Sequence, residues 1–305
     1  MLSHRHAAAV GTFLAIYPFV LLAQSGDPVP DVTYHTGTSE VRISFFATDE
    51  NRHAVENLNG EDFAIVDGDQ VIRSFRSLNR AQETNLDVVL LIDSSESVAH
   101  QFPTIVHEIL GLISRMPADD RVSVMAFGGT KPWVVCSDQS EVNCRTPRAE
   151  QRLLSIVPES STPLYDALML SADLLAKSKR ATARQMILLF SDGNDTVSRA
   201  TQAEALAELW PTNAALYTID LNHRACESNR WLEQLSALTG ARCFSMDAGA
   251  AGIVESIFTD LRTSYVVTYS LPSHMAGFHS LRILPKHNLN LRFYCRRGYV
   301  YDKNP

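Results

Sequence analysis

The chain has 305 residues, a hydrophobic fraction of 45%, a charged fraction of 20% and a formal net charge of −7. This length and composition are typical of one large or two modest globular domains with buried cores. The mild excess of acid and the lack of a basic stripe argue against nucleic acid or an anionic membrane surface as a partner.

The first residues resemble an export signal. A weakly basic start, His4-Arg5-His6, precedes an apolar stretch from Ala7 to Ala23, and small residues follow at a possible cleavage site. A membrane span needs about 20 apolar residues, so we expect residues 1–25 to be a cleaved signal peptide; an uncleaved anchor is the alternative. No later stretch is apolar enough to cross a bilayer. We therefore expect a secreted, periplasmic or cell-surface protein.

Residues 26–84 are predicted to form an N-terminal β segment after a short polar linker. Residues 41–47 alternate between apolar and polar side chains, as in a half-buried strand. Two further predicted strands, 63–66 and 71–75, are separated by Asp67-Gly68-Asp69-Gln70, which is a strong hairpin signal. This segment is too short to bury a core by itself.

Residues 85–264 change to strands that alternate with helices. We predict strands at 87–92, 121–127, 133–136, 185–190, 215–221 and 242–245, and helices at 97–116, 163–177, 201–210, 229–238 and 251–263. Such alternation indicates a doubly wound, mainly parallel sheet with helices on both faces, an α/β fold of the Rossmann-like kind.

Residues 265–305 are again β, with predicted strands at 265–271, 279–284 and 289–294. Each β segment is small, so we expect both to form one antiparallel β-sandwich into which the α/β domain is inserted. Two separate small lobes that flank the α/β domain are the alternative.

The five cysteines fit an oxidising compartment. Cys136 and Cys144 flank a polar loop and could form a disulfide, and Cys226 and Cys243 flank a predicted helix and could form another. Cys295 is left over. Both pairings are hypotheses, because sequence alone does not fix connectivity.

Polar side chains follow three of the predicted elements at one edge of the sheet. Asp93, Ser95 and Ser97 come after the first buried strand in an Asp-x-Ser-x-Ser pattern. Taken alone, this pattern could be a helix cap. Thr162 before a helix and Asp192 after another buried strand add two oxygen donors in the right order. Ligands bind at this edge of open α/β sheets, and hard oxygen donors suit Mg²⁺. The three loops together predict a cation site.

This ordered set resembles the von Willebrand factor type A domain and its metal-ion-dependent adhesion site, over about residues 85–263. The resemblance implies that the five side chains bind Mg²⁺ or Mn²⁺ and that an acidic side chain of a protein partner completes the coordination. The flanks, such as Leu58-Asn59-Gly60-Glu61-Asp62-Phe63 and Arg296-Arg297-Gly298-Tyr299, are similar to the secreted family called VWFA-related acidobacterial-type. One departure is Ser160-Ser161, where the family usually has two glycines.

The expected function is therefore a secreted, metal-dependent module for protein binding or cell adhesion, and not an enzyme. A periplasmic scaffold with a structural metal is the alternative. A phosphotransferase that resembles the haloacid-dehalogenase type is a weaker one, because those enzymes have a second acid two residues after the nucleophilic Asp, and this chain has Ser95 at that position. Asp166 is interpreted as a favourable negative charge near a helix N-terminus. Asp195 is interpreted as a residue that does not bind the metal directly and lies behind the ligands or in solvent. His274, His279 and His287 are predicted to lie at the surface.

Overall fold

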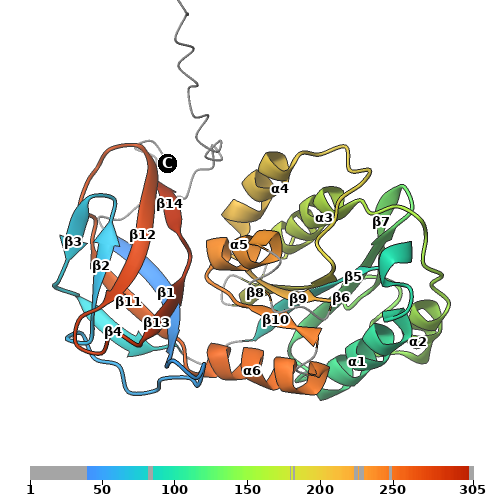
Figure 1. Cartoon of the computed structure of the whole chain (residues 1–305), viewed down its shortest axis with the longest axis horizontal. Coiled ribbons are helices and arrows are strands. Elements are labelled where there is room, and N and C mark those ends of the chain that lie inside the picture. The colour runs from blue at the N-terminus through green and yellow to red at the C-terminus, as the bar shows by residue number, and fades with distance from the viewer. Residues whose placement is uncertain are drawn as a thin grey trace, which may run out of the picture.

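The protein consists of an α/β lobe and a β lobe, as a computed structural model shows (Figure 1). The structure describes residues 40–81, 85–178, 180, 183–222, 226, 230–246 and 249–301. The predicted signal peptide, residues 1–25, lies outside the described residues.

The α/β lobe is built on a six-stranded sheet with the strand order β10-β9-β8-β5-β6-β7. The strands are β5 (Leu86–Asp93), β6 (Arg121–Gly128), β7 (Lys131–Ser137), β8 (Arg184–Ser191), β9 (Ala215–Asp220) and β10 (Cys243–Ser245). Neighbouring strands run parallel except for β6 and β7, which are antiparallel. The predicted doubly wound, mainly parallel sheet is confirmed.

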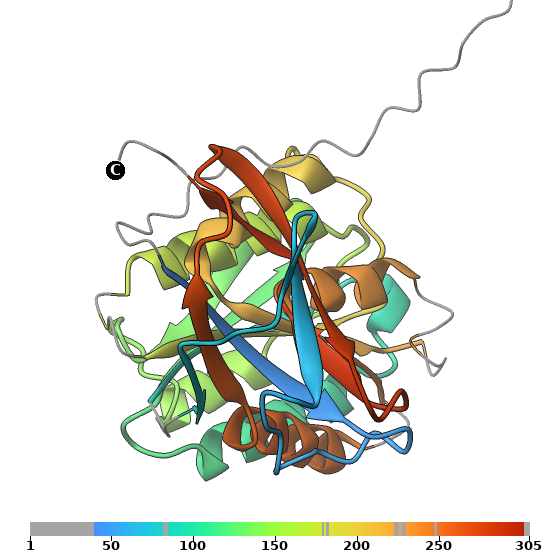
Figure 2. The same cartoon turned by 90° about the vertical axis from the view of Figure 1, so that its left-hand side faces the viewer.

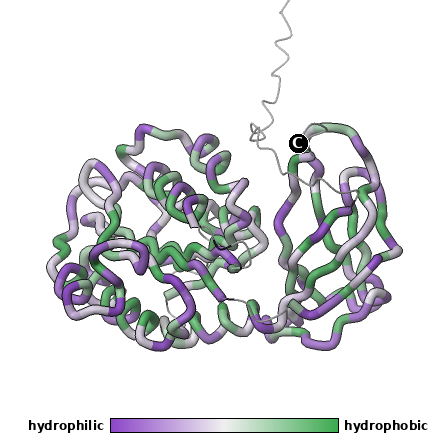
Figure 3. The backbone as a smooth tube through the Cα atoms, turned by 180° about the vertical axis from the view of Figure 1, so that it is seen from behind, coloured by the Kyte–Doolittle hydropathy of each residue, from purple (hydrophilic) through white to green (hydrophobic). Residues whose placement is uncertain are grey.

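Helices cover both faces of this sheet. They are α1 (Phe102–Arg115), α2 (Pro147–Leu154), α3 (Leu164–Ala176), α4 (Gln202–Leu209), α5 (Arg230–Thr239) and α6 (Ala250–Arg262), with short 3₁₀ turns at Glu96–Val98 and Trp210–Thr212. Side chains of α1, α2 and α6 share one core with the sheet, and those of α3, α4 and α5 share the other. Every residue of β5 is buried because both of its faces are covered, and the strands of this sheet form the apolar centre of the lobe (Figure 3).

Two helices differ from the prediction. Helix α1 begins at Phe102, five residues later than predicted, because residues 96–98 form a 3₁₀ turn and Pro103 occupies the first helical turn. Helix α2 was not predicted, although Thr146 caps it by accepting a hydrogen bond from the backbone of Ala149.

The β lobe is a sandwich of two four-stranded sheets, β13-β1-β11-β4 and β14-β12-β2-β3. The strands are β1 (Glu40–Thr48), β2 (Phe63–Asp67), β3 (Gln70–Ile72), β4 (Ser77–Arg80), β11 (Tyr265–Ser270), β12 (Gly277–Pro285), β13 (Arg292–Cys295) and β14 (Gly298–Tyr301). All strand pairs in it are antiparallel. Strands from the two ends of the described chain lie side by side in both sheets (Figure 2), which confirms the predicted sandwich. Strands β4 and β14 were not predicted.

A buried carboxylate organises the core of the sandwich. Asp67 ends β2, is 2% exposed, and is followed by Gly68 with φ +57° in the predicted hairpin turn. Its Oδ2 accepts hydrogen bonds from the hydroxyls of Tyr269 (2.7 Å) and Tyr299 (2.8 Å). Burial, aided by the Asp67 carboxylate, raises the pKa of both tyrosines. The two phenols therefore stay protonated and bind the carboxylate as donors.

The two lobes are joined by packed side chains as well as by the chain itself. Arg242 donates from Nε and Nη2 to Asp260 of α6 at 2.8 and 2.7 Å. Its guanidinium also lies 5.7 Å from the ring of Phe46 in β1 and 5.8 Å from that of Tyr294 in β13. Arg242 and Asp260 are 9% and 1% exposed. This ion pair therefore sits at the junction of α6 with the sandwich.

Candidate metal centre

The first predicted loop begins where β5 ends. Asp93 is fully buried, and its Oδ1 accepts a hydrogen bond from the backbone of Ser95 at 2.9 Å. Its Oδ2 accepts from the hydroxyl of Ser191, at the end of the neighbouring strand β8, at 2.7 Å. The hydroxyl oxygens of Ser95 and Ser97 lie 3.0 Å apart. The carboxylate is therefore fixed between two strands, with the two hydroxyls beside it.

The spacing of these hydroxyls fits an octahedral cation. Mg²⁺ binds oxygen at about 2.0–2.1 Å in near-ideal octahedral geometry. Adjacent ligands are then separated by about 2.8–3.0 Å, the bond length times the square root of two. The Ser95 and Ser97 oxygens, which are hydrogen-bonded to each other at 3.0 Å, therefore have a separation that is compatible with neighbouring ligands of such an ion.

The second loop is bonded directly to the first. The Glu159 backbone donates to Ser94 O at 2.8 Å and accepts from the Glu96 backbone at 2.6 Å. These bonds place the segment that leads to Thr162 beside the Asp-x-Ser-x-Ser turn. Thr162 is 3% exposed, and α3 begins two residues after it.

The third loop is bonded to the second. Thr162 N donates to the Thr196 hydroxyl at 2.8 Å, and Thr196 N donates to Thr162 O at 2.9 Å. Asp192 follows β8, is 4% exposed, and its Oδ1 accepts from the Asn194 backbone at 3.0 Å. The structure thus brings the three predicted loops to one edge of the sheet and joins them by hydrogen bonds.

Asp166 and Asp195 brace the second and third loops from outside. Asp166, in the first turn of α3, accepts hydrogen bonds from the backbones of Arg199 (3.1 Å) and Ala200 (2.9 Å). Asp195 accepts from the hydroxyl of Ser198 and from the backbone at the start of α3. The two acids therefore hold the loop after β8 against α3, which is a more specific role than the helix-start charge and the outer residue that were predicted.

Two supporting residues, Ser191 and Gly128, were not predicted from the sequence. Ser191, which binds Asp93, precedes the predicted ligand Asp192 directly. Gly128 ends β6, and a Cβ there would lie 2.6 Å from Ser94 O, so the turn after β5 requires glycine at this position. The hydroxyl of Ser191 could have been noticed as a further polar side chain at the carboxyl end of a buried strand.

The electrostatics of the site follow from its burial. Burial raises the pKa of Asp93 to about 6, the nearby Asp192 carboxylate adds to the rise, and hydrogen bonds from Ser95 and Ser191 oppose it. Among the described residues, no cluster of three or more His, Cys, Asp or Glu side chains could hold a metal. Any cation here would therefore depend on hydroxyl oxygens, and two carboxylates with three hydroxyls suit a hard ion such as Mg²⁺ or Mn²⁺.

The sequence model of the family described as von Willebrand factor type A domain matches residues 87–258, more than half of the chain. The chain belongs to this family. No curated protein matches its sequence.

Many solved structures are similar to the protein, among them the following three. An aerotolerance-related membrane protein from Bacteroides fragilis is 16% identical, with a TM-score of 0.46, and the match covers 58% of this chain and 98% of that chain. A von Willebrand factor type A protein from Catenulispora acidiphila is 12% identical (TM-score 0.46; 89% and 65% covered). The manganese-loaded TRAP protein of Plasmodium vivax is 17% identical (TM-score 0.46; 77% and 98% covered).

Two disulfides are present in the part of the chain that matches the family, residues 87–258, which is called the A domain below. Cys136 pairs with Cys144 at a Cα separation of 5.0 Å, and Cys226 pairs with Cys243 at 5.9 Å. Cys295 has a free thiol in the sandwich. Burial raises the pKa of this thiol to about 12. Cys295 is therefore a neutral thiol at physiological pH and is not suited to be a nucleophile.

One histidine prediction was wrong. His279 is only 8% exposed, and its Nε2 lies 2.9 Å from Met275 O, in the core of the sandwich. It lies on β12, where alternate residues face inwards, and position 279 falls on the inward side. His274 is exposed, as predicted.

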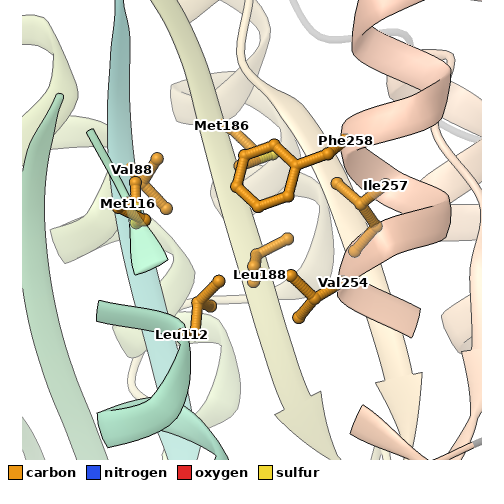
Figure 4. A pocket seen from close by; sticks show the side chains of 8 residues that line it. All are labelled: Val88, Leu112, Met116, Met186, Leu188, Val254, Ile257 and Phe258. Atoms are coloured by element: carbon orange, nitrogen blue, oxygen red, sulfur yellow. The ribbon is translucent and has the colours of Figure 1, made fainter. Parts of the chain in front are cut away.

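Two hollows away from the predicted metal loops provide no comparable site. A cavity of about 10 Å³ between the sheet and helices α1 and α6 is lined by apolar side chains alone (Figure 4), so it holds no polar partner for a ligand. A wider cleft between the lobes lies at the opposite edge of the sheet, near the start of β5 and β8. Of the arginines that line it, Arg180 pairs with Asp87 at 3.1 Å, and Arg184 donates to Leu261 O at 3.0 Å, so these two already have partners within the protein.

Proposed function

We propose that the A domain is a metal-dependent protein-binding module. Asp93, Ser95, Ser97, Thr162 and Asp192 bind Mg²⁺ or Mn²⁺, and the ion binds an Asp or Glu side chain of a partner. The observation that carries this proposal is the 3.0 Å separation of the Ser95 and Ser97 hydroxyl oxygens beside the buried Asp93. It matches the spacing of adjacent Mg²⁺ ligands.

The chemistry of the set supports a partner carboxylate. Three of the five donors are neutral hydroxyls. Both oxygens of Asp93 already accept hydrogen bonds within the protein, which spread its charge away from the ion. A divalent ion in this site would therefore keep an excess of positive charge and bind an external carboxylate strongly. Von Willebrand factor A domains are in general interaction modules rather than enzymes.

Residues 26–84 and 265–305 form, in this proposal, one supporting domain for the A domain at 85–264, in a secreted or periplasmic protein. The two disulfides support an oxidising compartment. None of the described helices combines the length and apolarity needed to span a bilayer.

Thermal unfolding with and without Mg²⁺ or Mn²⁺ tests the metal site. The wild type should unfold at a higher temperature when either ion is present, because the ion binds only the folded state. Asp192→Ala should abolish this shift. Asp173→Ala is a matched control, because this acid lies on α3 with its side chain 49% exposed and pairs with Lys177. An equal shift in wild type and Asp192→Ala would contradict the proposed site.

Capture of partners from extracellular matrix or envelope extracts tests the binding function. Partners should be retained with Mg²⁺ and lost with EDTA or in the Asp93→Ala variant. Partners that persist in all three conditions would refute metal-dependent binding. Stabilisation by Mg²⁺ without any Mg²⁺-dependent partner would instead favour a scaffold with a structural metal.

A further inference from the structure

Few large apolar side chains are exposed on the described part of the α/β lobe, and two of them, Val157 and Val197, lie in loops of the proposed metal site. Between residues 85 and 264 of the described chain, the exposed large hydrophobic residues are Val134, Leu154, Val157 and Val197. They lie on edge strand β7, at the end of α2, or in the second and third loops of the proposed metal site. The described parts of α1, α3, α4 and α6 expose none.

Val157 and Leu154 flank the metal site on the β7 side. Val157 is 75% exposed and lies two residues before Glu159, whose backbone is bonded to Ser94 and Glu96. Two residues span at most about 7 Å, so the backbone of Val157 lies within about that distance of Glu159, next to the turn that contains Ser95 and Ser97. Leu154, three residues earlier, is 65% exposed at the end of α2.

Val197 flanks the site on the other side. It is 41% exposed and follows Thr196, which is bonded to Thr162 in both directions. Its other neighbour, Ser198, accepts a hydrogen bond from the backbone of Tyr165 at 3.0 Å. The position of Val197 is therefore fixed from both sides beside the proposed ligand Thr162.

Acidic side chains close to the same loops limit what else a partner can carry. Glu96 lies between the two serine ligands, and Glu159 is bonded to this turn through its backbone; both side chains are exposed. A second carboxylate on the partner would be repelled by them. Only a carboxylate that reaches the ion itself gains enough attraction to approach.

We infer that the partner is a protein segment with a single carboxylate flanked on both sides by apolar side chains, which pack on Val157 with Leu154 and on Val197. This inference rests on the proposed function, because the carboxylate binds the metal. The two valines select the neighbours of that carboxylate, and Glu96 and Glu159 exclude further acids.

A phage-displayed library of short peptides with a fixed central Asp tests this inference. Peptides are selected on the wild type in Mg²⁺ and eluted with EDTA. The selected sequences should be enriched in apolar residues and depleted in acids next to the Asp. The best peptide should bind about tenfold more weakly to Val157→Ser/Val197→Ser, because burial of part of two valine side chains is lost. Val71→Ser is the matched control, since Val71 is 53% exposed on the sandwich, and should bind like the wild type.

The outcomes separate the inference from the proposed function. If binding survives EDTA or replacement of the central Asp by Asn, the proposed function fails. If binding requires Mg²⁺ and the Asp but the double variant binds as tightly as the wild type, only the inference fails. Selected peptides without apolar neighbours, or no Mg²⁺-dependent peptides at all, also overturn the inference. Glu159→Gln should admit peptides with a second acid, and unchanged exclusion would refute the role of that residue.

Discussion

The buried ion pair between Arg242 and Asp260 makes a quantitative prediction about stability. Arg242→Met removes the guanidinium but leaves Asp260, which is 1% exposed, without its two hydrogen bonds. Breaking a buried pair in this way costs about 3–5 kcal/mol. The double variant Arg242→Met/Asp260→Leu removes the stranded charge and should recover most of this loss, because apolar replacements of buried pairs are often neutral.

The pH dependence adds a second test of the same pair. Burial raises the pKa of Asp260 to about 7, although Arg242 opposes the rise. A carboxyl with a higher pKa in the folded than in the unfolded chain binds more protons when folded, so its contribution to stability falls as the pH rises from about 4 to about 7. Without the guanidinium that opposes the shift, the fall should extend to higher pH in Arg242→Met and disappear in the double variant.

Urea unfolding at pH 8, where Asp260 of the wild type is mostly ionised, measures these free energies. Arg262→Met is the matched control. Arg262 lies on α6, the helix that carries Asp260, is 53% exposed, and pairs with the exposed Glu255. It should change stability by less than about 1 kcal/mol. A loss below about 1 kcal/mol in Arg242→Met, or a double variant as unstable as the single, would refute the reasoning.

Three further predictions concern the sandwich core and the metal site. Asp67→Ala removes the carboxylate acceptor that the buried hydroxyls of Tyr269 and Tyr299 share and should reduce the free energy of unfolding by about 2–5 kcal/mol in urea titrations. Because the pKa of Asp93 is about 6, protons compete with the cation at acidic pH. The thermal shift that Mg²⁺ causes should therefore shrink as the pH falls through 6, and a constant shift from pH 7.5 to 5 would contradict this. Gly128→Ala forces a methyl group against Ser94 O and should weaken Mg²⁺ binding in calorimetry. An unchanged affinity would show that the turn after β5 accommodates a side chain at position 128 and would contradict the prediction.

The α/β lobe could be predicted from sequence because its central strands are recognisable from their own residues. β5 and β8 are continuous apolar runs, and such runs are typical of strands that are covered on both faces. The polar residues that follow them, Asp93 and Asp192, could then be placed at one edge without any knowledge of contacts. The order of the three loops in the chain was sufficient to identify the candidate site.

Other features depended on contacts that local patterns do not contain. Helix α2 is short and polar, with only Ala149 and Leu153 buried, so its only local signals were Thr146 as a cap and a proline in the first turn. The roles of Ser191 and Asp166 depend on partners 98 and 33 residues away. His279 was assigned to the surface because its burial follows from the register of β12, which the sequence of one strand does not determine.

The pairing of the sandwich strands has a consequence for the order in which the protein folds. Glu40 in β1 is paired with Ser270 in β11, and Asp67 in β2 with Leu281 in β12. Strands β1 and β4 therefore have no partners, and β2 is paired only with β3, until nearly the whole chain has emerged during synthesis. The α/β lobe, in contrast, can fold as soon as its own residues are available. Because the Ala81 backbone donates to Ser264 O at 2.8 Å, the folded lobe would hold residues 81 and 264 side by side. Folding of the inserted lobe thus brings together two chain positions that are about 180 residues apart in sequence. The strands of the sandwich then pair last.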